Sequence, residues 1–353
     1  MLGHRKSTWA APIAVAAALL AISVLAACGS DANSAADSVK RVGLMHVGLD
    51  HVPPSLEGIA DGLDELGWDV PNGEIESCAK NLKANCSVEG ENIELIWRNL
   101  EKTAADAQAE GFVSQGVDLV VAFEDASIGA AQEATIKSRT PVVFLHPNDP
   151  VRSGLVKSLA SPRANLTGVF GARDLVARHL ELYTQLVPGL KRVLALVDPE
   201  DSGTEYSLKE TQKAAKRLGV ELVVREATEA TDVQKVFRSL RPGEVDAVML
   251  LSASLRLNHT VLTLGLAKKA GLPVQAHRKD WVEQGALFSY GSDLYPIGHA
   301  AARYIDSILD GTVPSELAVQ EIPDVQFALN LATARRLGIK IPKRMIVQAD
   351  VTY

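Results

Sequence analysis

Aromatic residues and positive charge are both in short supply in this chain of 353 residues. Phe, Tyr and Trp make up 5% of the sequence, whereas hydrophobic residues as a whole make up 47%. The core must therefore be built mainly from Val, Leu, Ile and Ala, which suits parallel sheets covered by helices. Acidic residues outnumber basic ones, 43 to 36, and the net charge of −7 argues against a nucleic-acid-binding protein.

The sequence also lacks the motifs of several enzyme classes. It contains no nucleophile elbow G-x-S-x-G, no H-E-x-x-H and no phosphate-binding G-x-x-x-x-G-K. The turn at residues 201–204 holds a serine, but a nucleophile also needs a positioned base. A binding protein without a cofactor or a metal is therefore the favoured class.

The N-terminal segment is typical of a secretory signal peptide. A basic stretch at residues 4–6 precedes an apolar run that holds no charge from Trp9 to Cys28. A transmembrane helix is the alternative, because the run is almost long enough to span a bilayer, but Pro12 interrupts it. The run ends in LAAC at residues 25–28, which resembles the lipobox of bacterial lipoproteins. That resemblance implies that Cys28 becomes a diacylated N-terminus, which anchors the protein to the lipid membrane.

The segment GSDANSAADS follows this cysteine and is small and polar. It cannot bury enough apolar surface to fold. We therefore expect residues 1–27 to form the signal peptide and residues 28–39 a flexible tether, with the folded body on the extracytoplasmic face of the cell membrane. Loss of Arg5 and Lys6 takes the net charge from −7 to −9, so the body should stay soluble near an anionic membrane surface.

The other two cysteines, Cys78 and Cys86, bracket the polar stretch AKNLKAN. In an exported protein such a close pair favours a disulfide that closes a surface loop. Free thiols are the alternative. A metal site is disfavoured because no other ligand type lies nearby in the sequence.

From residue 41 onward, short β-branched segments alternate with longer amphipathic ones, as in βαβ units. The expected strands fall into two sets, RVGLMHVG, NIELIW, DLVVAFE and PVVFLH, then KRVLALVD, ELVVRE, DAVMLLS and PVQAH. The sets match in order, so we predict an α/β protein with two doubly wound parallel-sheet lobes. Ligands of such sheets bind beyond the carboxyl ends of the strands, here in a cleft between the lobes.

Several stretches carry a family resemblance that extends from about residue 41 to about residue 343. They are IADGLDELGW, ENIELIWRN, PVVFLHPNDPVRSGLVKSLASPRANLTGV, VPGLKRVLALVDP, GALFSYGSDLYPIG and NLATARRLGIKIP. In these stretches the chain resembles the tryptophan/tyrosine-type family of ABC transporter substrate-binding proteins. The resemblance implies a type I periplasmic-binding-protein fold, a small-molecule ligand, ABC permease subunits as partners and a monomer.

The family fold also implies how the lobes divide the chain. Lobe 1 is expected to hold residues 40–160 plus 289–320, and lobe 2 residues 161–288 plus 321–353. Three crossings between the lobes would form a hinge that closes on the ligand like a clamp.

Candidate ligand contacts of lobe 1 follow its strands. Asp50 and His51 match a loop that lines the cleft in the family, although a solvated His51 is an equal alternative. Asn148 follows the fourth strand and is preferred as a contact over Asp149, which can fix the turn instead.

A further group lies after the third strand, where Glu124, Asp125 and Ser127 stand in place of the family's small or hydroxyl residues. The carboxylates would repel an anionic group there, but they can hold an amine or a polyhydroxyl ligand through charge-assisted hydrogen bonds. Alternatively, Asp125 is only the favourable charge at the start of a helix. Ser127 can still donate a hydrogen bond.

Lobe 2 offers mainly hydroxyl groups after its strands, which suit a polar ligand. The candidates are Ser202, Thr204, Ser252 and Ser254, together with Asp280 for a ligand amine. Arg278 can bind a carboxylate, although a single loop arginine is more often exposed. Possible stacking walls for a flat ligand are Tyr290, which we favour, and Tyr206, Trp281 and Phe123, the last more suited to the core.

The sequence thus predicts a lipid-anchored receptor that delivers a small polar molecule, amino-acid-like or amine-bearing, to an ABC importer. An accessory sensor that signals to a membrane receptor is an alternative with the same clamp. An extracytoplasmic α/β enzyme is the less favoured one.

Overall fold

We analysed a computed structural model that describes residues 39–47, 52–71, 73–80, 85–100, 104–162, 165–173, 175–201 and 203–353. The predicted signal peptide, Cys28 and nearly all of the tether lie outside these ranges, as do Asp50, His51 and Ser202. Within the described ranges, no helix is both long and apolar enough to cross a membrane.

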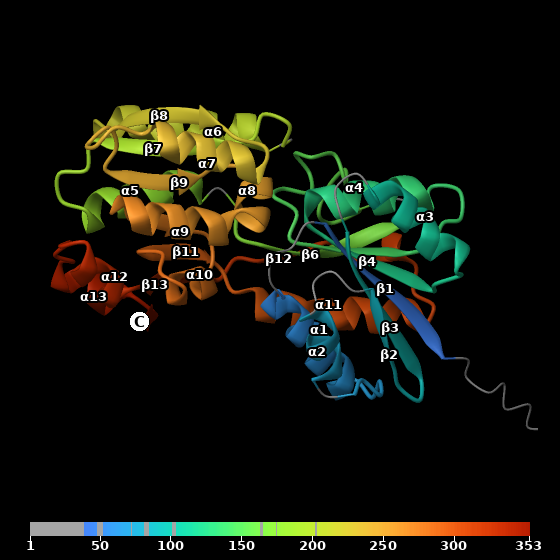
Figure 1. Cartoon of the computed structure of the whole chain (residues 1–353). Coiled ribbons are helices and arrows are strands. Elements are labelled where there is room, and N and C mark those ends of the chain that lie inside the picture. Colours follow the sequence, from blue (N-terminus) through green and yellow to red (C-terminus); the bar gives the residue numbers. More distant parts are fainter. Residues whose placement is uncertain are drawn as a thin grey trace, which may run out of the picture. The chain divides into compact units, whose positions relative to one another are not determined.

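Two seven-stranded sheets organise residues 38–353, which form one compact unit (Figure 1). The first sheet, in spatial order, consists of β2 (Cys86–Glu89), β3 (Ile93–Leu100), β1 (Lys40–Val47), β4 (Leu119–Phe123), β5 (Val142–Leu145), β6 (Leu166–Gly171) and β12 (Gln320–Ile322). The second consists of β8 (Glu221–Glu226), β7 (Arg192–Val197), β9 (Ala247–Leu250), β10 (Val274–Ala276), β11 (Phe288–Ser292), β13 (Val325–Leu329) and β14 (Val351–Thr352). The predicted doubly wound α/β fold is confirmed.

Five strands follow the same order in both sheets, β3-β1-β4-β5-β6 in the first and β8-β7-β9-β10-β11 in the second. In each, the first strand along the chain lies between the second and the third, followed by the fourth and the fifth. All of these neighbours pair in parallel. As a result, β4 and β9 occupy equivalent positions, and so do β5 and β10.

Helices cover both faces of each sheet, which explains the Val- and Leu-rich strands. On β4, Leu119, Val121 and Phe123 belong to one buried cluster and Val120 and Ala122 to another. The helices of the first lobe are α1 (Pro54–Glu65), α2 (Glu74–Ala79), α3 (Ala105–Ser114), α4 (Glu124–Thr135) and α11 (Leu294–Leu309), and the 3-10 helix η2 spans Pro314–Glu316. In Figure 1, α1, α2 and α11 lie on one face of its sheet and α3 and α4 on the other.

The second lobe has more, and generally shorter, helices. They are α5 (Val176–Leu186), α6 (Thr204–Leu218), α7 (Ala230–Ser239), α8 (Ala253–Asn258), α9 (Thr260–Ala270), α10 (Lys279–Glu283), α12 (Leu331–Arg336) and α13 (Lys343–Gln348). Strand β7 again alternates between two buried clusters, with Val193 and Ala195 in one and Leu194 and Leu196 in the other.

The chain changes sheets later than the predicted lobe boundaries. Residues 166–171 form β6, which pairs with β5 in the first sheet although they were assigned to lobe 2. Residues 288–292 form β11, which pairs with β10 in the second sheet, so the chain returns to the first lobe only with the helix that follows, and it stays there through β12. Each sheet thus gains a fifth parallel strand before the chain leaves it. The crossings follow Gly171, Ser292 and Ile322.

A disulfide joins Cys78 of α2 to Cys86 of β2, as the sequence analysis expected for an exported chain. The two Cα atoms are 6.0 Å apart. The bond attaches the short helix α2 to the outermost strand of the first sheet.

Helix α11 is fixed in the first lobe by close contact with α1. A Cβ atom at Gly58 would lie 2.2 Å from the backbone oxygen of Tyr295, and one at Gly298 would lie 2.0 Å from that of Ser55. Because these neighbours are backbone atoms, the two helices cannot keep this separation with any larger residue.

We predict that Gly58→Ala lowers the free energy of unfolding by about 1–3 kcal/mol, since overpacking forces the helices apart. Gly129 of α4 is the matched control, because a Cβ there meets no atom within 4 Å. Gly129→Ala should raise stability by roughly 0.5–1 kcal/mol through helix propensity. Urea unfolding of both variants checks the opposite signs. Equal effects would show that the α1–α11 contact is loose.

Candidate ligand-binding cavity

A cavity of about 480 Å³ lies where the carboxyl ends of the strands of both sheets meet the crossing segments. This volume is typical of a small-molecule site, for which the usual range is about 300–1,000 Å³. Its walls include residues that follow β4, β5 and β6 in the first lobe and residues that follow β9 and β10 in the second. The position agrees with the general rule for open α/β sheets.

Two residues of the cavity wall have strained backbones. Glu124 directly follows β4 with φ 61°, and His146 directly follows β5 with φ 60°. A non-glycine residue in the left-handed region costs on the order of 1–3 kcal/mol and persists where the surroundings hold it, often at functional sites. Both turns aim polar side chains at the same space.

The Glu124 carboxyl group is held in an unfavourable environment for its charge. Oε2 is buried and has no hydrogen-bond partner within the described part of the chain. Burial raises the pKa of Glu124 to about 8, and the nearby Asp125 raises it further, while Arg278 and Arg256 act in the opposite direction. Near neutral pH this carboxyl group is therefore largely protonated.

Asp125 and Asn148 lie together, as two of the predicted contacts. Asn148 donates a hydrogen bond from Nδ2 to Oδ2 of Asp125 at 2.6 Å. Its Oδ1 atom lies 3.4 Å from Nη2 of Arg256, which comes from the opposite lobe. Burial raises the pKa of Asp125 and lowers that of Arg256. The pKa of Arg256 is raised in turn by three nearby acids, Asp201, Glu124 and Asp125.

Only 4% of the Arg278 surface is exposed. A single arginine on a loop is usually exposed, so this residue differs from the general expectation. It lines the cavity and forms an ion pair with Asp280 at 3.1 Å. Asp280, predicted as a partner for a ligand amine, is not part of the cavity wall and instead balances this arginine.

Two histidines of the wall are neutral. Burial lowers the pKa of His146 to about 3, with the charge of Arg278 acting in the same direction. Burial also lowers the pKa of His179 to about 4. Nε2 of His179 lies 2.6 Å from the backbone oxygen of Tyr290, so that nitrogen carries the proton and donates.

Tyr206, rather than Tyr290, supplies a tyrosine ring to the cavity wall. The Arg152 guanidinium, from the first lobe, lies over the Tyr206 ring at 3.7 Å from its centroid. The Tyr290 ring packs against Phe327 and His179 instead. The other aromatic candidates, Trp281 and Phe123, are both fully buried.

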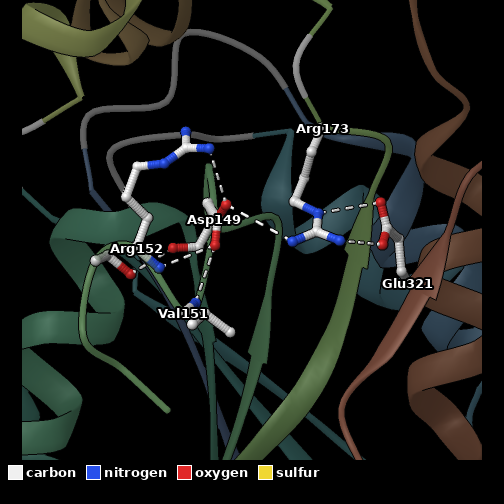
Figure 2. Close-up of polar contacts among 6 residues, drawn as sticks. Asp149, Val151, Arg152, Arg173 and Glu321 are labelled. Carbon is white, nitrogen blue, oxygen red and sulfur yellow. Dashed lines mark hydrogen bonds and ion pairs between the residues drawn. The ribbon is translucent and has the colours of Figure 1, made fainter. Parts of the chain in front are cut away.

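Arg173 links the first crossing segment to two carboxylates (Figure 2). Its Nη2 and Nε atoms donate to the Glu321 carboxylate at 2.7 and 3.2 Å, and Nη1 lies 3.7 Å from Oδ2 of Asp149. Oδ1 of Asp149 accepts hydrogen bonds from the backbone N–H groups of Val151 and Arg152. Asp149 thus fixes a turn, which was one of its two predicted roles.

Of the predicted hydroxyl contacts that the structure describes, none lines the cavity, and Thr204, Ser252 and Ser254 hold loops together instead. Thr204 hydrogen-bonds with Ser252, which accepts from the backbone N–H of Asp198 at 2.7 Å. Ser254 donates to Oδ2 of Asp198 at 2.7 Å. Ser127 is fully buried within α4.

Several residues of the wall were not among the predicted contacts: His146, Arg173, His179 and Arg256. One signal for Arg256 was present, because it lies one helical turn after Ser252, at the end of a strand equivalent to β4. Over the described residues, no group of three or more His, Cys, Asp or Glu side chains is arranged to hold a metal ion.

Two sheets of the same strand order, three crossings and a ligand-sized cavity define a binding protein of the type I periplasmic-binding-protein fold. The chain belongs to the family of ABC transporter substrate-binding proteins, whose family model matches residues 54–353. The family consists of substrate-binding proteins rather than enzymes.

Individual relatives cover nearly the whole chain. A tyrosine-binding protein of Clostridioides difficile is 25% identical over 337 residues, which are 92% of this chain and 91% of that protein. A conserved domain protein of Vibrio cholerae is 26% identical, with a TM-score of 0.76 over 89% of this chain and 100% of its own. The ABC domain in complex with L-Trp from Streptococcus pneumonia has the same fold, at 22% identity and a TM-score of 0.72, over 90% of this chain and 100% of its own.

We predict that Glu124→Gln changes how stability depends on pH. Because the pKa of Glu124 is raised to about 8 in the folded protein, the folded state binds more protons than the unfolded chain between about pH 4.5 and 8. The wild-type contribution therefore falls as pH rises through this range. Relative to wild type, the variant should gain at least about 1 kcal/mol between about pH 5 and pH 9.

Urea unfolding at several pH values measures this gain, with Glu133→Gln as the control. Glu133 lies on the same helix but is exposed, so its variant should follow the wild-type curve. Parallel curves for all three proteins would contradict the raised pKa.

We further predict that Arg173→Gln lowers the free energy of unfolding by about 1 kcal/mol or more, because Glu321 loses a bidentate partner and the buried Asp149 carboxylate loses one of its two arginines. The control is Arg178→Gln, since Arg178 pairs with Glu181 through one contact of 3.4 Å on the surface of α5 and otherwise only lies 5.9 Å from the centre of the Tyr290 ring. Its effect should be within about 0.5 kcal/mol. A small effect of both substitutions would show that Arg173 does not stabilise the contact between the crossing segments.

Proposed function

We propose that this protein is the lipid-anchored, extracytoplasmic receptor of an ABC importer. In this proposal it binds a small polar solute, amino-acid-like or amine-bearing, in the 480 Å³ cavity. The single observation that carries the proposal is that both lobes and two of the three crossing segments contribute to one cavity. A solute there would contact both lobes at once, so that rotation about the crossings can enclose it.

The chemistry of the wall supports an amino-acid-like ligand. Carboxyl groups of Glu124 and Asp125 come from one lobe, and the guanidinium group of Arg256 comes from the other. A molecule with an ammonium group and a carboxylate complements both sets. The tyrosine bound by one relative and the L-Trp bound by another belong to this chemical class.

The family and the N-terminus support delivery to a transporter. Substrate-binding proteins of this family serve ABC transporters, as the family description states. The LAAC sequence at residues 25–28 supports acylation of Cys28 and attachment to the outer face of the cell membrane. Permease subunits are the expected partners.

A thermal-shift screen of the purified protein without residues 1–37 tests the proposal. The panel holds amino acids, amines, nucleobases, vitamins and sugars. A ligand at about 100 times its Kd adds roughly 2.7 kcal/mol of stability, which raises the melting temperature measurably. We expect a shift with one class of compound, recovered chemically unchanged. No shift with any class would contradict a role as a solute receptor.

A further inference from the structure

Most charged groups of the cavity wall already have partners. Arg173 pairs with Glu321, Arg152 with Asp149 and Arg278 with Asp280. These pairs balance much of the charge that folding buries, so they leave little reason to recruit a ligand. The remaining carboxyl groups of the wall are those of Glu124 and Asp125 on one side, and the remaining guanidinium group is that of Arg256 on the other.

These remaining groups carry buried polar atoms that the protein does not satisfy. Oε2 of Glu124, Oδ1 of Asp125 and Nε of Arg256 have no hydrogen-bond partner among the residues that the structure describes. An unsatisfied buried polar group costs about 1–3 kcal/mol, and more when it is charged. Such groups in a native structure call for an explanation, and in a cavity wall a ligand is the natural one.

Their positions in the fold place them on opposite lobes. Glu124 and Asp125 begin α4, directly after β4, and Arg256 lies in α8, shortly after the equivalent strand β9. Asn148 lies between them, because it donates to Asp125 and accepts from Arg256. A small molecule in the cavity can therefore reach the carboxylates with one end and the guanidinium with the other.

We infer that the ligand is a zwitterion whose ammonium group binds Glu124 and Asp125 and whose acidic group binds Arg256. This assignment rests on the proposed function, since it specifies the ligand of the same cavity. The ammonium group offers three donors to the two unsatisfied carboxyl oxygens. The acidic group accepts from the guanidinium, whose Nε otherwise remains buried without a partner.

The strained turn at Glu124 fits this role. Its left-handed backbone starts α4 directly after the strand and places the Glu124 side chain in the cavity wall. In the family resemblance, small or hydroxyl residues occupy this loop. A helix start alone attracts a negatively charged ligand group. With two acids at this helix start, the position favours a positively charged one.

Ligand capture is then coupled to proton release. Glu124 is faced by Asp125 on its own helix, Arg256 on α8 and Arg278 after β10, and the neutral His146 lies near Arg278. Because burial raises the pKa of Glu124 to about 8, its carboxyl group is mostly protonated at neutral pH. An ammonium ion favours the ionised form, so binding should expel close to one proton at about pH 7.

The test uses isothermal titration calorimetry with the twenty common L-amino acids as probes. For each amino acid that binds, we add the matching amine without the carboxyl group and the matching acid without the amino group. Both analogues should bind at least about tenfold more weakly than the amino acid. Titrations at about pH 7 in buffers of different ionisation enthalpy count the protons released.

Two variants separate the two ends of the ligand. Glu124→Gln should weaken the amino acid at least about tenfold and abolish proton release, while the acid without an amino group binds as before. Arg256→Gln should weaken the amino acid similarly and leave the amine unaffected. The controls are Glu133→Gln on α4 and Arg238→Gln on α7, both exposed positions away from the cavity.

Each outcome decides between the inference and the proposed function. An amino acid that binds Glu124→Gln as tightly as wild type would overturn the inference and leave the receptor role intact. The same holds if only uncharged solutes such as sugars shift the melting temperature. If no compound of any class binds, the receptor role fails as well.

Discussion

The whole arrangement depends on the place where two crossing segments run against each other. Ala172, in the first crossing, donates a backbone hydrogen bond to Oγ of Ser292 at the second, at 2.8 Å. A Cβ atom at Gly171 would lie 2.2 Å from the same oxygen, so a side chain there would displace Ser292. All three residues also line the cavity. The point at which the chain changes sheets therefore shapes the binding site, and neither can be altered alone.

Around this point, the protein balances most buried charge within itself. Arg173 bridges the first crossing to Glu321 at the third, and Asp293 at the second accepts from both Lys279 and Gln326. These polar links connect segments far apart in the sequence and satisfy their charges. The cavity is the exception, because it combines unsatisfied buried atoms with two left-handed non-glycine residues. Local instability of this kind is typical of a preorganised site.

Sequence reasoning recovered the fold better than the site. The apolar strands and their repeated order were readable because parallel strands buried on both faces must be Val- and Leu-rich. The lobe boundaries were misplaced because the apolar pattern of β6 or β11 would be the same in either sheet. The sequence therefore does not show which sheet each strand joins. Glu124, Asp125 and Asn148 were expected from their places after strands and do line the cavity, whereas Thr204, Ser252 and Ser254 hold loops together. The position of His146 depends on a left-handed turn, which no spacing reveals. Arg256 follows Ser252 by one helical turn, a signal that the sequence analysis did not use.

The internal repeat gives the two lobes equivalent positions after β4 and β9, which carry acidic groups in one lobe and a basic group in the other. The same position after the third strand holds acids in one lobe and leads to an arginine one turn later in the other. Under the proposed assignment, a ligand with a single charge would satisfy one lobe and leave a buried group of the other unpaired, which opposes closure. A zwitterion satisfies both only when both lobes touch it. Selectivity and closure would thus arise from the same contacts, because discrimination comes from the unpaired group that the wrong solute leaves behind.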